Sequence, residues 1–408
     1  MTDVKLWTST PSLSILLLSP RPYPSRPGSR TGPPFNDEGD ARARLAISRT
    51  GHSVKAPTIS PPVELPASHA AVRTRRFRPD RLKASAPLLA VVVVLAIVGL
   101  SGSTLWVDVA NQAIIAAIAA IGLSLLLGHA GLISVGNAAF LAIGAFTVAK
   151  VSIAYGVPFP VAVVGSGLVC ALVGTVVALP SFRISGLYLA MSTLAFHFVA
   201  IWGLRQLQTH DVGDAGYAVP VATIFGVEIV ELRTWLVLLG LVVVGVLLTY
   251  RWLIESKVGR ALHAIRERPA LAAMSGISVT KYKVAAFGSS SFLVGIAGAL
   301  HAYYIGRVSY ANYESIDLAI EYLGMVIIGG LGTIYGPVIG AALIVSLPHL
   351  VHALQGRLGL DRFIAAGDIF LVQGALVGLV VAAMVIFQPG GLIGIGRSVR
   401  RLTWRRSK

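Results

Sequence analysis

Long apolar segments alternate with short polar or charged ones through most of this chain. The apolar segments lie at 87–107, 109–127, 133–154, 158–180, 187–205, 234–252, 284–306, 318–352 and 368–387. Most of them have about 20 residues, the length that a helix needs to cross about 30 Å of hydrocarbon. The pattern predicts an all-α, polytopic membrane protein. The composition agrees, because 55% of the 408 residues are hydrophobic and only 13% are charged, against roughly 25% in soluble proteins.

One apolar segment, 318–352, is too long for a single crossing and is interrupted by GGLGTIYGP at 329–337. We expect it to split at Tyr335-Gly336-Pro337 into two short arms. This gives about ten crossings with both termini in the cytoplasm. A re-entrant pair of broken helices is an equal alternative, since broken helices are tolerated in a membrane where other protein or water satisfies the backbone.

Basic clusters between the apolar segments set the expected orientation. They lie at 73–83, in the loop 254–283 and in the tail 397–408 of a chain with a formal net charge of +16. The positive-inside rule places all three in the cytoplasm of a bacterial inner membrane, so the charge indicates no nucleic-acid partner. Residues 1–83 are rich in Pro, Ser and Arg without apolar periodicity, which predicts a disordered extension. A translation start placed too far upstream explains that extension equally well.

The charged segment 253–283 is where the middle of the chain leaves the lipid. It contains apolar residues at spacings i, i+3, i+4 and i+7, which predict a helix with one apolar stripe: Val258, Ala261, Leu262 and Ile265. Ser256 suits the start of this helix, Pro269 begins a second short helix, and Gly276 closes it. Two short exposed helices favour docking to a partner. The stripe faces either that partner or the cytoplasmic ends of the membrane helices, and the sequence leaves this open.

Small and polar residues gather in two apolar regions, 126–146 and 329–337. Such residues let membrane helices pack closely, or they line a solute path in which the ends of broken helices meet a zwitterion. The candidate path residues are Gly131, Ser134, Gly136, Asn137, Thr193, Gly330 and Gly332. His197 lies within an apolar segment, where a hydrogen-bonded packing role is the commoner one.

Several motifs are absent from the sequence. There is no GxxxxGK[ST], so the chain does not hydrolyse nucleotide through a P-loop. Asp108, Glu321 and Asp368 lie at segment edges, so an ion gradient has no obvious mid-membrane carboxylate to act on. No His, Cys or carboxylate pair has metal-ligand or acid-base spacing, so we assign no metal ligand, no catalytic residue and no enzymatic activity. The single cysteine, Cys170, excludes an intrachain disulfide.

Four stretches together resemble one known family. They are residues 128–147, GLYLAMSTLAF at 186–196, the loop sequence at 256–287, and MVIIGGLGTIYGPVIGA at 325–341. They look like the M-like permease subunit of branched-chain amino acid (LIV-type) ABC importers, over about 84–396. The resemblance implies a second permease subunit, two cytoplasmic ATPases that bind the ATP, and an extracytoplasmic binding protein. It implies no cofactor in this chain.

The resemblance also identifies the loop as the ATPase-coupling loop. The positions that match its motif are Gly259, Arg260, Ala264, Ile265, Arg266 and Gly276. The chain departs from the family at Arg268, Pro269 and Ala270, where an Asn and acidic residues are usual, and at Leu132 and Asn137, where Gln and His are expected. The alternative is a stand-alone carrier or channel for a small polar solute such as urea or short amides.

Overall fold

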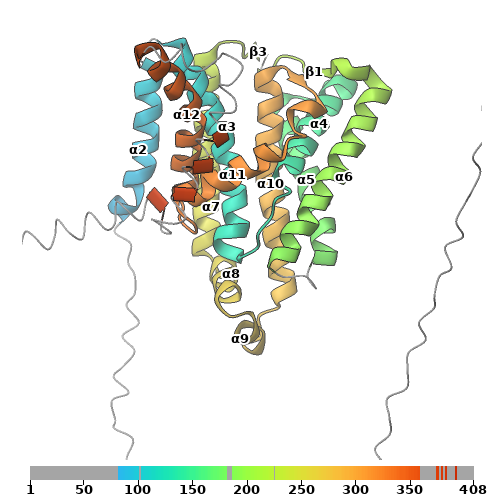
Figure 1. Ribbon diagram of the computed structural model, residues 1–408, viewed down its shortest axis with the longest axis vertical. Helices are drawn as coiled ribbons and strands as arrows, with labels where there is room; N and C mark the ends of the chain where they lie inside the picture. The colour runs from blue at the N-terminus through green and yellow to red at the C-terminus, as the bar shows by residue number, and fades with distance from the viewer. Residues whose placement is uncertain are drawn as a thin grey trace, which may run out of the picture. The chain divides into compact units, whose positions relative to one another are not determined.

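The computed structural model describes residues 81–100, 103–181, 186–224 and 226–358, together with a few positions between 374 and 392. The described residues are mainly helical, as the sequence predicts (Figure 1). In chain order the main helices are α2 (Arg81–Leu100), α3 (Thr104–Ser124), the π-helix η1 (Leu125–Ala130), α4 (Asn137–Tyr155), α5 (Phe159–Ser181), α6 (Leu187–Val212), α7 (Leu232–Glu255), α8 (Lys257–Glu267), α9 (Pro269–Met274), α10 (Val279–Ile305), α11 (Ile316–Gly329) and α12 (Gly336–Leu358).

Five helices in the described part of the chain are long and apolar enough to cross a membrane. They are Thr104–Ala130, Asn137–Tyr155, Phe159–Leu179, Leu232–Glu255 and Val279–Ile305, and shorter apolar helices cover Leu89–Leu100 and Gly336–Val351. The chain is therefore a multi-pass helical membrane protein. The count of ten crossings and the cytoplasmic termini stay predictions. Residues 1–80, the segment 368–387 apart from isolated positions, and the tail 397–408 lie outside the described residues.

The first helix boundary differs from the expected one. The sequence pattern divides the first two spans at residue 108, whereas α2 ends at Leu100 and α3 begins at Thr104, after Ser103 in an extended conformation. Hydropathy alone does not register the small polar residues SGS at 101–103, because the apolar residues on both sides dominate the average. Asp108 therefore lies within the first turns of α3, where Gln112 and Tyr304 donate hydrogen bonds to its carboxylate.

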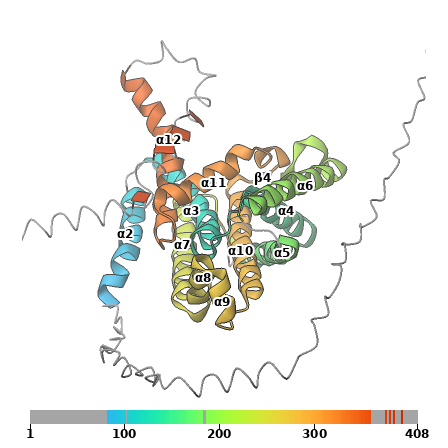
Figure 2. The same ribbon diagram turned by 60° about the horizontal axis from the view of Figure 1, so that its bottom comes forward.

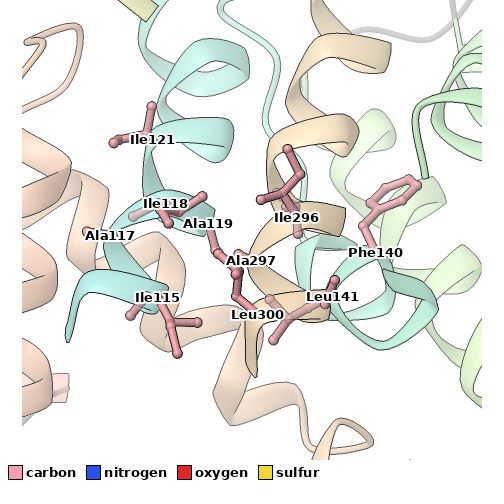
Figure 3. Packing of buried hydrophobic residues seen from close by; sticks show 14 of the residues in the cluster. Ile115, Ala117, Ile118, Ala119, Ile121, Phe140, Leu141, Ile296, Ala297 and Leu300 are labelled. Carbon is pink, nitrogen blue, oxygen red and sulfur yellow. The ribbon is translucent and has the colours of Figure 1, made fainter. Parts of the chain in front are cut away.

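The helix α10 lies at the centre of the bundle. It packs against α3, α4 and α5, while α3 also packs against α7 and α12, so that α4, α5 and α6 lie on one side and α2, α7, α11 and α12 on the other (Figures 1 and 2). The buried core between α3, α4 and α10 is formed by apolar side chains (Figure 3). They include Ile115, Ile118, Leu141, Ala297 and Leu300.

Glycines allow the closest helix approaches in this core. A Cβ on Gly295 of α10 would lie 2.6 Å from Cys170 of α5, and a Cβ on Gly144 of α4 would lie 2.8 Å from the Cα of Gly295. Cys170 is fully buried, and its thiol donates to the carbonyl oxygen of Phe140. Ser291, Gly295 and Ala299 lie four residues apart along α10. Small residues at this spacing allow neighbouring helices to pack closely.

The long segment 318–352 is divided as predicted. The first arm, α11, has 14 residues and ends at Gly329, and α12 begins at Gly336. Between them Gly330 has φ 116° and Gly332 φ 72°, conformations that favour glycine. A Cβ on Gly340 would strike the backbone of Met325, so the two arms pack directly against each other.

Two short antiparallel ladders lie at the end of the bundle opposite α8 and α9 (Figure 1). The strand β1 (Tyr217–Ala218) pairs with β4 (Arg307–Val308), and β2 (Thr223–Ile224) pairs with β3 (Val227–Glu228). We call this the strand end of the bundle. The β1–β4 ladder joins the segment between α6 and α7 to the end of α10, whereas β2 and β3 both lie within that segment.

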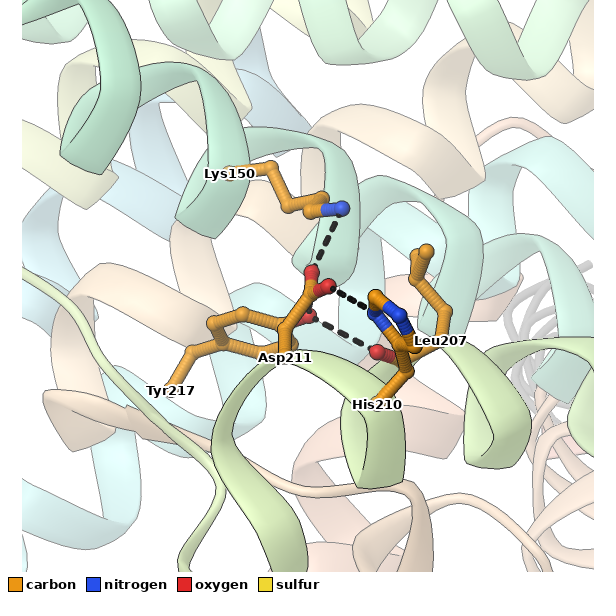
Figure 4. Close-up of polar contacts among 5 residues, drawn as sticks. All are labelled: Lys150, Leu207, His210, Asp211 and Tyr217. Atoms are coloured by element: carbon orange, nitrogen blue, oxygen red, sulfur yellow. Dashed lines mark hydrogen bonds and ion pairs between the residues drawn. The ribbon is translucent and has the colours of Figure 1, made fainter.

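An ion pair ties α4 to α6 at the strand end (Figure 4). Lys150 Nζ lies 2.7 Å from Asp211 Oδ2, and the Tyr217 hydroxyl donates to the same carboxylate at 2.7 Å. The Asp211 carboxylate also lies 3.1 Å from His210 Nδ1. The Lys150 ammonium, with Tyr217 and His210, holds the pKa of Asp211 well below its usual range. The cluster therefore contributes to stability only while Asp211 is ionised.

Candidate functional site

The two helices α8 and α9 project from the bundle end opposite the strands (Figure 1). Ser256 caps α8, because its Oγ accepts a hydrogen bond from the Val258 N–H at 3.1 Å. A Cβ on Gly259 would collide with the backbone of Ile254. Gly259 is therefore required for the sharp corner between α7 and α8, and it is buried rather than available to a partner.

The apolar stripe of α8 faces its own bundle. Leu262 and Ile265 are each 1% exposed, Ala261 is buried as well, and α8 packs against α7, η1 and α10. This answers the question that the sequence leaves open. Because the stripe is covered within the chain, the surface left for a partner carries the exposed residues Lys257, Arg260, His263 and Arg268.

The second helix, α9, is closed by a glycine as predicted. The Gly276 N–H donates to the Ala273 carbonyl at 3.0 Å, the Ile277 N–H donates to the Ala272 carbonyl at 3.1 Å, and Gly276 has φ 81°. This pair of bonds is the Schellman arrangement. Two apolar side chains of α9, Leu271 and Met274, are exposed, and Met274 is 76% exposed. Sequence reasoning missed both, because the periodicity of α9 is too short to define a face.

Arg266 is an exposed residue of α8 that also contacts the bundle. Its Nη1 donates a hydrogen bond to the Gly128 carbonyl oxygen in η1. A Cβ on Gly131 would lie 3.0 Å from Arg266 Cγ, and a Cβ on Gly332 would lie 3.3 Å from Arg266 Nη1. Arg266 therefore has an acceptor within its own chain, and its proximity to an ATPase stays a prediction. We call Gly128, Gly131, Arg266 and Gly332 the junction.

The junction joins three elements that are distant in sequence. A Cβ on Gly128 would lie 2.7 Å from the Gly332 N, so η1 and the loop between α11 and α12 touch backbone to backbone. Gly131 ends η1 in the left-handed region with φ 67°. The end of a helix exposes unpaired carbonyls and a partial negative charge. A guanidinium from α8 satisfies one of these carbonyls.

A polar group supports η1 from inside the bundle. The Tyr250 hydroxyl of α7 donates to Ser124 Oγ at 3.1 Å and lies 3.2 Å from His129 Nδ1. All three side chains are buried. A π-helical turn is often found at functional sites, and this one is fixed both by the buried group and by Arg266.

The remaining candidate path residues gather where α4 begins. The Val135 N–H donates to Thr193 Oγ1 at 3.0 Å, and a Cβ on Gly136 would lie 2.8 Å from the Thr193 carbonyl oxygen. Asn137, 3% exposed, is the first residue of α4, and Ser134 is equally buried. The seven candidates thus fall into two places: Gly131, Gly330 and Gly332 in and beside the junction, and Ser134, Gly136, Asn137 and Thr193 at the start of α4.

His197 is partly satisfied by its own chain. It is fully buried on α6, and its Nε2 lies 3.3 Å from the Glu314 carbonyl oxygen. Because a carbonyl only accepts, Nε2 carries the proton in this contact, and Nδ1 has no partner among the described residues. No group of three or more His, Cys, Asp or Glu in the described part of the chain could hold a metal ion.

Comparisons with known proteins identify the family of this chain. The chain is 28% identical over 321 residues to the high-affinity branched-chain amino acid transport system permease protein LivM of Salmonella typhimurium, and equally to that of Escherichia coli, covering 72% of each chain. It is 29% identical over 144 residues, 34% of its length and 39% of the relative, to the fructose import permease protein FrcC of Rhizobium meliloti. No solved structure matches. The family model described as branched-chain amino acid transport system / permease component matches residues 105–388, so the chain belongs to this family of membrane permeases.

Proposed function

We propose that this chain is a membrane-spanning subunit of an ATP-driven importer for branched-chain or related amino acids, in the bacterial inner membrane. It pairs with a second permease subunit, two cytoplasmic ATPases and an extracytoplasmic binding protein. ATP binds only to the ATPases. The observation that carries the proposal is the junction, in which Arg266 of the projecting helix α8 bonds to Gly128 at the end of a long membrane helix.

The energy for transport enters at α8 and α9. The apolar residues Leu271 and Met274 of α9 are exposed, and so are the basic residues Arg260 and Arg268 of the same projecting segment. Exposed apolar and basic side chains suit an apolar groove with acidic residues on the ATPase. When the ATPases move, α8 moves with α9 because the two helices follow each other directly and are in contact, and Arg266 transmits the displacement to η1 and Gly332.

The charges at the two ends of the bundle support this orientation. The end with α8 and α9 carries mainly basic residues: Arg251, Lys257, Arg260, Arg266, Arg268, Lys281 and Lys283. The strand end carries most of the acidic ones: Asp211, Asp214, Glu228, Glu231, Glu314 and Asp317. Basic residues stay on the cytoplasmic side, so the strand end faces the binding protein.

Reconstitution tests the proposal. The chain is placed in proteoliposomes with a candidate second permease and candidate ATPases from the same genome, and uptake of leucine, urea and a short amide is measured with a binding protein and ATP. We expect ATP-dependent uptake of an amino acid, and we expect Gly259→Pro and Arg260→Glu to abolish it while the chain still inserts. Uptake driven by a gradient through the purified chain alone would instead establish a stand-alone carrier.

A further inference from the structure

The helix α4 begins inside the protein rather than at its surface. Every residue from Gly136 to Ala142 is buried, although a helix start normally lies where water or a capping side chain can satisfy its free N–H groups. No side chain caps α4. The N–H groups of Asn137 and Ala138 have no acceptor among the described residues. Burying an N–H group without an acceptor costs free energy. Stability of the fold therefore does not explain why α4 starts at a buried position.

The side chain of Asn137 adds a further free donor at the same place. Asn137 is only 3% exposed, and its Nδ2 has no hydrogen-bond partner among the described residues. Asn137 is the first residue of α4, and the Cα–Cβ bonds of a helix tilt toward its N-terminus, so the side chain starts at the same helix end as the free N–H groups. The 19 residues of α4 also place the positive end of the helix dipole here.

We propose that the start of α4 is the subsite for the carboxylate of the transported amino acid, with Asn137 Nδ2 and the N–H groups of Asn137 and Ala138 as donors. The inference rests on the proposed function and deepens it. A carboxylate has two oxygens that accept several hydrogen bonds, and a helix N-terminus stabilises its charge. The N–H group of the neighbouring Val135 already has an acceptor, because it donates a hydrogen bond to Thr193 Oγ1. The Val135 N–H is therefore not available to a ligand.

The burial of Asn137 means that a solute reaches this subsite only when α4 and α6 separate. The backbones of α6 and the α4 start touch at Gly136 and Thr193, so this contact is the one that opens. A permease that alternates its access needs such a closed conformation as well as an open one.

The test compares ligands with and without a carboxylate. The full chain, with its second permease subunit in nanodiscs, is titrated with L-leucine and with isoamylamine, and the shift in Tm is measured. We expect leucine to raise the Tm of wild type and isoamylamine to leave it unchanged. Asn137→Ala should weaken leucine binding roughly ten- to hundredfold, since hydrogen bonds to charged groups are the stronger class. Asn137→Asp should abolish it by charge repulsion.

The outcomes separate this inference from the proposed function. Equal shifts with leucine and isoamylamine, or wild-type leucine binding by Asn137→Ala, would overturn the carboxylate subsite. If Asn137→Asp fails to fold, Asn137→Ala and the comparison of leucine with isoamylamine still test the carboxylate subsite. ATP-driven uptake of only a carboxylate-free solute would overturn the subsite and leave the importer standing. Absence of any ATP-driven uptake would overturn the importer, while the shifts in Tm still report on the subsite.

Discussion

The guanidinium of Arg266 donates a hydrogen bond to the carbonyl oxygen of Gly128, 138 residues earlier in the chain. This bond connects a short helix outside the bundle to the end of a helix that crosses it. Gly332 lies against both groups. A displacement of α8 therefore acts on two breaks in membrane helices at once, the one after η1 and the one between α11 and α12.

Replacing Arg266 by Gln should separate ATP hydrolysis from transport. The variant keeps a donor but loses the charge that attracts a helix C-terminus. We expect uptake per ATP hydrolysed to fall by about tenfold, as for the loss of a charged hydrogen bond. The measurement is the ratio of the two rates in proteoliposomes. Lys281→Gln, at an exposed basic residue outside the proposed docking surface, serves as control, and a wild-type ratio in Arg266→Gln would contradict the role of the junction.

Alanine at the junction glycines should destabilise the chain. Gly131 and Gly332 have φ values of 67° and 72°, and an L-residue in this region costs roughly 1–2 kcal/mol. Contacts with Arg266 at 3.0 and 3.3 Å add to the strain. Thermal unfolding in detergent measures the effect. Gly245→Ala on α7 is the matched control, because its added Cβ meets nothing within 4 Å, and its Tm should not fall.

Charge on the tip of α9 should block ATPase docking without harming the fold. Met274 is 76% exposed, so Met274→Glu costs the isolated permease little but would bury a carboxylate in the proposed groove. We expect the ATPases to be lost on co-purification while the Tm of the chain is unchanged. Lys281→Glu, an exposed charge change at the start of α10, is the control. Normal ATPase retention by Met274→Glu would show that docking uses another surface.

The Asp211 cluster predicts a stability that depends on pH. Lys150 lowers the pKa of Asp211 in the folded chain, so its stabilisation is fully present above the unfolded value of about 3.9 and is lost as the pH falls through the folded value. The difference in Tm between wild type and Asp211→Asn should therefore be constant near neutrality and shrink below about pH 4. A difference as large at pH 2 as near neutrality would mean that charge is not its cause.

The sequence predicted the structure of α8 and α9 more fully than that of the proposed solute path. Ser256, Pro269 and Gly276 each act through the local backbone, within three or four residues, so their roles follow from position in the chain. The direction of Arg266 does not, because it depends on an acceptor 138 residues away. Asn137 likewise appears in the sequence as one small polar residue among several. The role that we propose for it depends on a helix start that the surrounding helices bury.

Composition and periodicity by themselves determined that this chain is a helical membrane protein with a split segment near 330–336 and a projecting pair of short helices. These properties depend on transfer of apolar residues into lipid and on local backbone preference, which act residue by residue. Tertiary structure alone decided which face of α8 is covered, which carbonyl Arg266 bonds to, and which donors at α4 remain free. Each of those depends on close approach between segments far apart in the chain, which hydropathy does not encode.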